Sequence, residues 1–387
     1  MQDTSTRTWS NHADYASRLF IFKVANFCNI NCSYCYMYNM GDLSFEGRPP
    51  TMSKAVAEAA LTRIHEYSLA NKIDEITITL HGGEPLLVKR SWYSWFLGKA
   101  ASIFGHNVKI AFALQTNGIL LTDEWIDFLV EHNIGFGISV DGPADIHDKF
   151  RVDHKGRGTY AKTEVAIKRC ASRPDIAEEW GILAVANPNY SSVRIFDHLR
   201  ALGVKKFDFL LPDHHHDNPP PWNSGELSRF YIELFDHWYE QNDSSVRIRF
   251  FESIIKGMLG YPTGIDALGV HPISEIVVET DGSLEPLDVL RTCANGYTNQ
   301  RLNVLTHTID DLRDTEVFRL GLLNQDHLPR ACMDCEAYEI CGGGYLPHRF
   351  SRETQFNNRS IHCETLLDLF QHIHGVVSRD FDKAASL

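Results

Sequence analysis

Three cysteines stand close together near the N-terminus. They are Cys28, Cys32 and Cys35, and the segment CNINCSYC gives them the spacing C-x3-C-x2-C. Three thiolates on one tight loop can ligate three irons of a cubane [4Fe–4S] cluster, which leaves the fourth iron without a protein ligand and open to a substrate or cofactor. A zinc site is the alternative, but zinc prefers four ligands, and no fourth Cys or His lies at normal spacing on this segment.

A second group of cysteines lies near the C-terminus with the spacing C-x2-C-x5-C-x21-C: Cys332, Cys335, Cys341 and Cys363. Four thiolates can complete a closed [4Fe–4S] site. Zinc is again the alternative, because C-x2-C is also half of a zinc ribbon. Cys170 falls in an apolar helical pattern and is expected in the core. Cys293 is expected to be a buried thiol, with an unusual metal ligand as the alternative.

The elements that must position these residues alternate between strand and helix. Apolar runs predict strands at Leu19–Ala25, Ile73–Leu80, Val108–Leu114, Ile134–Val140, Trp180–Val185 and Phe207–Leu211. Helical spacing predicts helices at Ser53–Ala70, Ser91–Phe104, Thr122–Glu131, Tyr160–Ala171 and Ser192–Leu202. This alternation predicts an α/β fold with a parallel sheet, and roughly six βα units favour an open, partial (β/α)6 TIM-like barrel.

Polar motifs follow these strands directly. The first cysteine group follows the first strand, and Gly82-Gly83-Glu84-Pro85, Gln115-Thr116-Asn117-Gly118 and Ser139-Val140-Asp141-Gly142-Pro143 follow the next three. Asp213 follows the last strand and heads the run His214–His216. Functional loops gather at the carboxyl ends of parallel strands, so we expect all these motifs at one mouth of the sheet.

Together these motifs resemble the radical S-adenosylmethionine (SAM) superfamily over about residues 19–215, with Tyr34 as the aromatic residue before the third cysteine. The resemblance implies that the open iron chelates the amino and carboxylate groups of SAM. One electron, from an external donor, then produces a 5′-deoxyadenosyl radical. It also implies cofactor contacts from Tyr34, Gly82, Gly83, Glu84, Gln115, Asn117, Ser139 and Arg151. In this family Glu84 and its loop face the amino group, and Ser139 and Arg151 hold the carboxylate.

The C-terminal group resembles the SPASM extension of radical enzymes that modify peptides and proteins. By that resemblance Cys332, Cys335, Cys341 and Cys363 ligate the outer auxiliary cluster. Tyr345 and Leu287 stand where ligands of an inner auxiliary cluster are often found. We therefore expect one auxiliary [4Fe–4S] cluster.

The segments CGGGYLPHRF (341–350) and ETDGSLEPLDVLR (279–291) resemble a narrower group, the FxsB, GrrM and XyeB-like enzymes. These act on ribosomally synthesised precursor peptides and join an aromatic ring carbon to the β-carbon of a nearby residue, forming a three-residue cyclophane. Such a reaction needs a base for the ring proton, and Asp213 is our candidate, with the neighbouring histidines as alternatives. Two other interpretations stay open: sulfatase maturation by oxidation of a Cys or Ser, and a non-catalytic iron–sulfur or zinc regulatory protein.

Composition limits the partners and the location. The formal net charge of −13 over 387 residues argues against general binding of a nucleic-acid backbone. No apolar run is long enough to span a membrane and no signal peptide is evident, so a cytoplasmic protein is expected. We expect a lead-in (1–18), the radical SAM barrel (19–215), a helical linker region (216–274) and a SPASM-like domain (275–387). The short lead-in predicts that a leader peptide binds the enzyme surface or a separate leader-recognition protein.

Overall fold

The computed structural model describes residues 15–385. One curved sheet holds ten strands in the order β12-β11-β10-β1-β3-β4-β5-β7-β8-β9. Every neighbouring pair from β10 to β9 is parallel, whereas β11 and β12 are antiparallel to their neighbours. The strands are β1 (Leu19–Ala25), β3 (Glu75–Gly82), β4 (Lys109–Thr116), β5 (Ile134–Ser139), β7 (Trp180–Val185), β8 (Lys206–Leu210), β9 (Arg247–Ile248), β10 (Ile276–Val278), β11 (Ser283–Glu285) and β12 (Leu302–Asn303).

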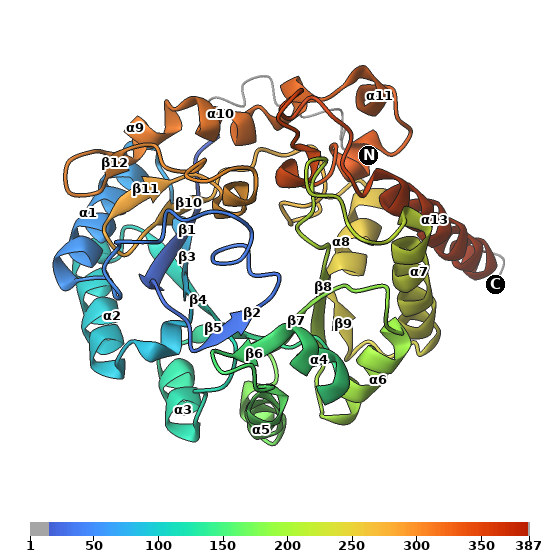
Figure 1. The fold of residues 1–387 in the computed structure, drawn as a ribbon, viewed down its shortest axis with the longest axis horizontal. Coiled ribbons are helices and arrows are strands. Elements are labelled where there is room, and N and C mark those ends of the chain that lie inside the picture. The colour runs from blue at the N-terminus through green and yellow to red at the C-terminus, as the bar shows by residue number, and fades with distance from the viewer. Residues whose placement is uncertain (1–14, 386–387) are drawn as a thin grey trace.

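Helices cover the outer side of this sheet (Figure 1). Those of the barrel are α1 (Lys54–Ala70), α2 (Arg90–Phe104), α3 (Asp123–Glu131), α4 (Ala144–Phe150), α5 (Tyr160–Ala171), α6 (Ser192–Ala201) and α7 (Ser224–Glu240). They are followed by α8 (Arg249–Met258), α9 (Ile309–Arg313), α10 (Glu316–Leu322), α11 (Arg330–Met333), α12 (Tyr338–Cys341) and α13 (Cys363–Ala385). The strands curve round a central space, which confirms the predicted partial α/β barrel.

Alternating burial along the strands explains how the sheet is built. In β3 the side chains of Ile76, Ile78 and Leu80 are buried, and the residues between them are more exposed. Residues two apart point to the same face of a strand, so the buried set packs under the helices and the other set faces the central space. The same pattern in β5 leaves Gly135, Gly137 and Ser139 to line the inside of the barrel, and in β7 it leaves Gly181, Leu183 and Val185.

A small second sheet joins the first cysteine group to a later loop. Strand β2 (Ile30–Cys32) pairs antiparallel with β6 (Arg151–Asp153), and Cys32 lies opposite Arg151. The sequence analysis predicted neither strand, because three residues are too few to carry a periodic pattern. The pairing brings the loops after β1 and β5 together at the mouth of the barrel.

The C-terminal part of the chain continues the barrel sheet. Strand β10 lies parallel to β1, with Phe20 opposite Ile276 and Phe22 opposite Val278. Strands β10 and β11 form a hairpin, and Gly282 at its turn has φ +87°, a conformation that favours glycine. The predicted domain boundary at residue 275 therefore falls where the chain joins the sheet, and the four-part division stays a prediction.

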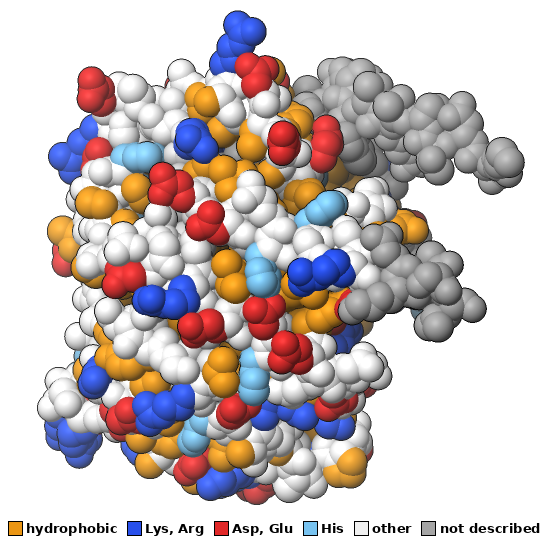
Figure 2. All heavy atoms as spheres, turned by 90° about the vertical axis from the view of Figure 1, so that its right-hand side faces the viewer, with side chains coloured by type: hydrophobic (Ala, Val, Ile, Leu, Met, Phe, Trp, Pro, Cys, Tyr) orange, Lys and Arg blue, Asp and Glu red, His pale blue; other side chains and the backbone are white. Residues whose placement is uncertain are grey.

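Helix α13 runs alongside α7 at the edge of the barrel (Figure 1). Two polar contacts fix this pairing: Ser228 donates to Asp368 at 2.7 Å, and a ring nitrogen of His372 lies 2.6 Å from Asp236. Seen from this side, the surface carries acidic and basic side chains interspersed with small apolar areas (Figure 2). Between residues 15 and 385, no helix combines the length and apolar character needed to cross a membrane. The predicted lead-in lies largely outside the described residues.

Candidate active site

The first cysteine group forms a tight turn directly after β1. The N–H of Cys35 donates to the carbonyl of Cys32 at 3.1 Å, and all three thiols are partly buried. Burial, together with the nearby charges of Glu84, Cys32 and Cys35, raises the pKa of Cys28 to about 12. Thiols that repel one another in this way ionise readily when a cationic centre binds them, so the donor set fits an iron cluster.

The Gly82-Gly83 turn touches the backbone that leads into this cysteine loop. The N–H of Gly83 donates to Ala25 at 2.9 Å, and that of Glu84 donates to Phe27 at 3.0 Å. A Cβ on Gly83 would lie 2.2 Å from the carbonyl oxygen of Phe27. Only glycine permits this approach, so the motif after β3 supports the cysteine loop from one side.

Glu84 is buried, and protein donors take up both of its carboxylate oxygens. One oxygen accepts from the N–H of Leu86 at 2.9 Å and from the hydroxyl of Thr116 at 2.7 Å, and the other accepts from the N–H of Asn117 at 2.8 Å. Burial raises the pKa of Glu84 to about 7, although these hydrogen bonds oppose the rise. The carboxylate therefore ties the loops after β3 and β4 together.

The loops after β4 and β5 continue around the mouth. The side-chain amide of Asn117 donates to Asn29 at 2.7 Å and lies 3.7 Å from the sulfur of Cys28. Gln115 donates to the hydroxyl of Ser139 at 2.8 Å. The structure thus brings three predicted cofactor residues onto one rim beside the cysteines.

Arg151 lies beside Cys32, but Asp141 holds its guanidinium in a two-pronged ion pair with distances of 2.9 and 3.2 Å. Tyr34 donates a hydrogen bond to the same carboxylate, and the Arg151 guanidinium stacks on the Tyr34 ring at 5.4 Å. Burial favours the neutral form of Asp141, but Arg151 outweighs it and keeps the pKa of Asp141 lowered. Asp141 is thus a residue of the site that the sequence analysis quoted only within its motif.

A cavity of about 720 Å³ opens next to this ion pair at the carboxyl ends of the strands. Its wall includes Tyr34 and Asp141 from the cysteine side, and Asp213, Trp222, Cys293 and Arg352 from later parts of the chain. Residues separated by more than 300 positions therefore share one wall. The volume suits a peptide side chain together with part of its backbone.

Asp213 lies in the wall of this cavity with 27% of its side chain exposed. Burial, followed by repulsion from Asp288, raises its pKa to about 7. A ring nitrogen of His348 lies 3.8 Å from its carboxylate.

The three histidines after Asp213 have different partners. A ring nitrogen of each one contacts a backbone carbonyl: Asn218 for His214 at 3.0 Å, Thr292 for His215 at 3.0 Å and Arg359 for His216 at 2.8 Å. These contacts fix the loop that follows β8. Asp213 is the carboxyl group at the start of that loop.

The second cysteine group also comes together. Burial, together with the charges of Cys363, Cys332 and Cys335, raises the pKa of Cys341 to about 12. Four neighbouring thiols fit a closed iron–sulfur site. Among residues 15–385, no three or more His, Cys, Asp or Glu side chains converge as ligands of a single ion. A cubane distributes its ligands over separate irons, which requires a wider spacing.

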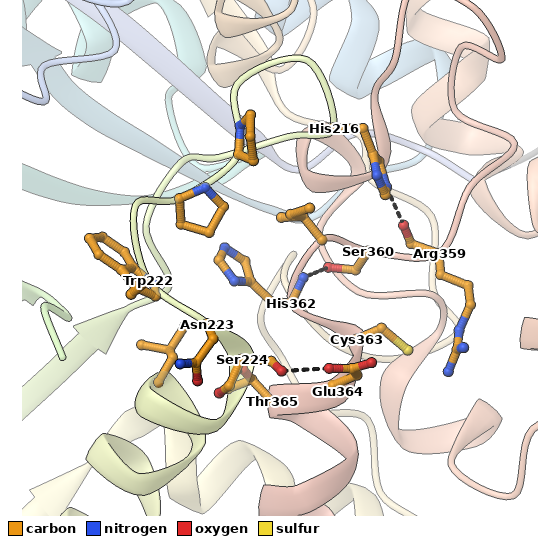
Figure 3. Close-up of a pocket in the computed structure, with 14 residues that line it drawn as sticks. His216, Trp222, Asn223, Ser224, Arg359, Ser360, His362, Cys363, Glu364 and Thr365 are labelled. Carbon is orange, nitrogen blue, oxygen red and sulfur yellow. Dashed lines mark hydrogen bonds between the residues drawn. The ribbon is translucent and has the colours of Figure 1, made fainter.

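A smaller cavity of about 380 Å³ adjoins Cys363. It lies between the loop that leads into α7 and the N-terminal end of α13 (Figure 3). Trp222 lines both this cavity and the larger one, so the loop after β8 separates the two. Arg359 lies beside Cys363. The charge of the Cys363 thiol is the largest cause that raises the pKa of Arg359, and a hydrogen bond between the two side chains is the second.

Packed side chains occupy the positions where ligands of an inner auxiliary cluster are often found. Leu287 and Tyr345 belong to one buried apolar cluster, together with Cys293, Leu290 and Phe350. Cys293 is 3% exposed, as expected for a buried thiol, and Cys170 is fully buried in the main core. The described residues therefore assemble one group of C-terminal cysteines.

Buried charges join the first cysteine loop to the C-terminal segment. Lys23 in β1 forms an ion pair with Asp288, and Tyr36, next to Cys35, donates to the same carboxylate at 2.7 Å. Nearby, Arg291 pairs with Glu279 at 2.7 Å and with Glu285 at 2.9 Å, all fully buried. Burial favours neutral Asp288, but Lys23 and Arg291 prevail and lower its pKa.

Residues 22–174 match the family model described as the Radical SAM superfamily. The chain therefore carries a radical SAM domain and is an enzyme. The radical SAM domain implies a [4Fe–4S] cluster and SAM as cofactors, and the C-terminal cysteines are consistent with an auxiliary cluster. The interpretation as a non-catalytic regulatory protein is therefore not supported.

The similarity of this radical SAM enzyme to known proteins extends beyond that domain. It is 26% identical to a cysteine-type anaerobic sulfatase-maturating enzyme of Clostridium novyi over 89% of this chain and 91% of the relative. It is 25% identical to a serine-type anaerobic sulfatase-maturating enzyme of Bacteroides thetaiotaomicron over 94% of this chain and 91% of the relative. Solved structures of native anSMEcpe with bound AdoMet, alone and with a Kp18Cys peptide, share the fold, with a TM-score of 0.80, 24% identity and coverage of 95% and 99%.

Proposed function

We propose that this radical SAM enzyme oxidises a side chain of a bound peptide or protein by two electrons, starting with removal of a β-hydrogen. One observation carries the proposal. The same 720 Å³ cavity is bordered by Tyr34 and Asp141, which adjoin the first cysteine loop, and by Asp213, whose pKa is about 7. A radical source and a base for the later proton loss therefore face one substrate space.

The first cysteine loop and the surrounding rim form the proposed cofactor site. We assign Cys28, Cys32 and Cys35 as cluster ligands, and Tyr34, Gly82, Gly83, Gln115, Asn117, Ser139 and Arg151 as the residues around SAM. Bound together, cluster and SAM supply a 5′-deoxyadenosyl radical. Glu84 contributes by holding two of the rim loops together, since its oxygens accept hydrogen bonds from Leu86, Thr116 and Asn117.

Asp213 is the proposed base. A base works best when its pKa lies near the operating pH, and a pKa of about 7 meets that condition. Its carboxylate would accept the proton that the substrate loses after its β-hydrogen has been removed. Cys332, Cys335, Cys341 and Cys363 are the proposed ligands of one auxiliary cluster, which offers an acceptor for the second electron.

Two products fit this chemistry. The sulfatase-maturating relatives favour two-electron oxidation of a Cys or Ser side chain. A Ser would lose two hydrogens to become an aldehyde, whereas a Cys would become a thioaldehyde, which water hydrolyses to the same aldehyde with release of hydrogen sulfide. The packed Leu287 and Tyr345 at the inner-cluster position favour the second candidate, because they resemble the peptide-crosslinking group rather than a two-cluster enzyme. In that case the substrate is a ribosomally synthesised precursor peptide, and the product is a bond between an aromatic ring carbon and a β-carbon. A separate leader-recognition protein and an external electron donor are the expected partners.

The test uses the full chain reconstituted anaerobically with iron and sulfide, and then supplied with SAM and dithionite. One peptide set carries a Cys or Ser in a sulfatase-type context, and the other carries an aromatic residue near its C-terminus. We expect 5′-deoxyadenosine together with a peptide lighter by two hydrogens, or the aldehyde formed from Cys. Reaction with a hydrazide identifies an aldehyde, whereas a crosslink gives no adduct and suppresses backbone fragments between the joined residues.

The Cys32→Ala variant is the control, and we expect it to form no 5′-deoxyadenosine above background. If the wild-type chain with an intact cubane signal yields no 5′-deoxyadenosine with any peptide, the proposed function is wrong.

A further inference from the structure

His348 is a buried imidazole with no role in the chemistry proposed so far. It lies in the short helical turn Leu346–Arg349, and it is 1% exposed. Neither of its ring nitrogens makes a hydrogen bond within the described structure. Buried polar atoms are nearly always paired, so an imidazole with two unpaired nitrogens needs an explanation.

Several titratable groups face this ring. Asp213 lies 3.8 Å from one nitrogen, the His362 ring is 4.7 Å away, and the Tyr345 ring is 5.2 Å away. His214 and His215 lie farther off. His214, His215 and His362 each direct a ring nitrogen at a backbone carbonyl, whereas Asp213 presents a carboxylate oxygen to a ring nitrogen of His348. Burial lowers the pKa of His348 to about 3, so the neutral ring keeps one N–H donor and one acceptor nitrogen.

The position of His348 relative to the cavity suggests what it does. Asp213 lies in the wall of the cavity with 27% of its side chain exposed, so a bound peptide covers it from that side. His348 lies 3.8 Å from the Asp213 carboxylate and is itself buried. The Tyr345 ring packs edge-on against His348, and its hydroxyl is hydrogen bonded to the half-buried Asp266. The packing of Tyr345 therefore helps to fix the His348 ring next to Asp213.

We propose that His348 is a positioning residue that holds the Asp213 carboxylate toward the cavity by donating its facing ring N–H to that carboxylate. The inference rests on the proposed role of Asp213 as the base. The substrate proton moves to the Asp213 carboxylate, and the neutral His348 ring keeps its own proton throughout. Asp213 releases the proton to water when the product leaves the cavity, so every group returns to its starting state.

The test compares His348→Ala and His348→Gln with the wild-type holoenzyme on a peptide that the wild type modifies. Because His348 acts after hydrogen abstraction, we expect 5′-deoxyadenosine formation to stay within about twofold. Product per 5′-deoxyadenosine should fall roughly 10- to 100-fold in His348→Ala, because a misplaced base accepts the substrate proton less efficiently. Added imidazole should restore part of that loss, and His348→Gln should retain more product because glutamine still offers a donor.

The matched control is His65→Gln. His65 in α1 also has a buried ring nitrogen without a hydrogen bond, but it packs against Phe104 on the outside of the barrel. We expect that variant to match the wild type in product per 5′-deoxyadenosine.

Two results would overturn the role of His348. One is an unchanged product ratio in both His348 variants at normal iron content. The other is a parallel loss of product and 5′-deoxyadenosine that imidazole does not relieve. A wild-type enzyme that forms no 5′-deoxyadenosine points instead to failure of the proposed function, and the inference falls with it.

Discussion

Asp213 heads a run of four titratable side chains whose environments differ. Its three histidine neighbours each contact a backbone carbonyl, which fixes their rings and the loop that carries them. Asp213 lies between the cavity and the buried His348, and burial raises its pKa to about 7. Burial thus makes a carboxyl group, rather than an imidazole, the side chain suited to accept a proton near neutral pH.

Replacing Asp213 with Asn is therefore expected to lower product per 5′-deoxyadenosine by about 10²- to 10⁴-fold, the usual contribution of a general base. In the wild type, product formation should decline as the pH falls below about 7, because the carboxylate becomes protonated there. Liquid chromatography of both products over a pH series measures this. Asp127→Asn, on the exposed surface of α3, is the control. A normal product ratio in Asp213→Asn would exclude Asp213 as the base.

Residue-level predictions could be made where the information was local. The spacing of Cys28, Cys32 and Cys35 lies within eight consecutive residues, so the sequence alone indicates the donor set. The pairing of Arg151 with Asp141 depends on the short β2–β6 sheet, which has no periodic signal. The approach of His348 to Asp213 joins segments far apart in the chain, and a single sequence holds no trace of it.

Among the elements, the strands and helices of the barrel were predictable because their apolar periodicity is strong. The polar loops after β1, β3, β4 and β5 do converge at one mouth, as the rule for parallel strands implies. The pairing of β10 with β1 was not predictable, since strand partners distant in sequence leave no local pattern. Short strands such as β9 and β12 were not predicted, because, like β2, they have too few residues to carry a periodic pattern.

The loop after β3 offers a test of how closely these elements fit. Gly83→Ala would set a Cβ 2.2 Å from the carbonyl oxygen of Phe27, so the cysteine loop would have to move. We expect reduced iron content and a loss of 5′-deoxyadenosine formation. Gly98→Ala in α2 is the matched control, because no atom lies within 4 Å of a Cβ at that position.

Alanine at residue 98 should leave iron binding intact and stabilise the helix by about 0.5–1 kcal/mol, since glycine is a poor helix former. Iron analysis and 5′-deoxyadenosine yield, measured side by side, separate the two variants. Equal iron content and yield in both would mean that the close approach of the two loops is not required.

For the molecule as a whole, buried carboxyl groups with raised pKa values make stability depend on pH. Burial raises the pKa of Glu84 and of Asp213 to about 7, and it also raises that of Glu275. The folded protein then holds protons that the unfolded chain releases at a lower pH. These groups stabilise the fold fully below their unfolded pKa values and lose that contribution as the pH rises through about 7.

Buried histidines act in the opposite direction, but at lower pH. Burial lowers the pKa of His81 and His348 to about 3, so their effect ends once the unfolded histidine is neutral, above about pH 6.5. Between pH 6.5 and 8 we therefore expect the unfolding free energy to fall by about 1–2 kcal/mol. Denaturant unfolding of the reconstituted enzyme at both pH values measures it, and the Asp213→Asn variant should show a smaller fall. A rise across this interval would contradict the assignment.

The parallel pairing of β1 with β10 also bears on how the enzyme is made. The first strand leaves the ribosome early, but its neighbour on one side, Ile276–Val278, is translated more than 250 residues later. The cysteine loop that follows β1 also depends on Asp288, whose carboxylate accepts a hydrogen bond from the Tyr36 hydroxyl. We therefore expect the assembly proteins that deliver iron and sulfide to act on a nearly complete polypeptide. A nascent chain stalled before residue 276 should acquire no stable cluster.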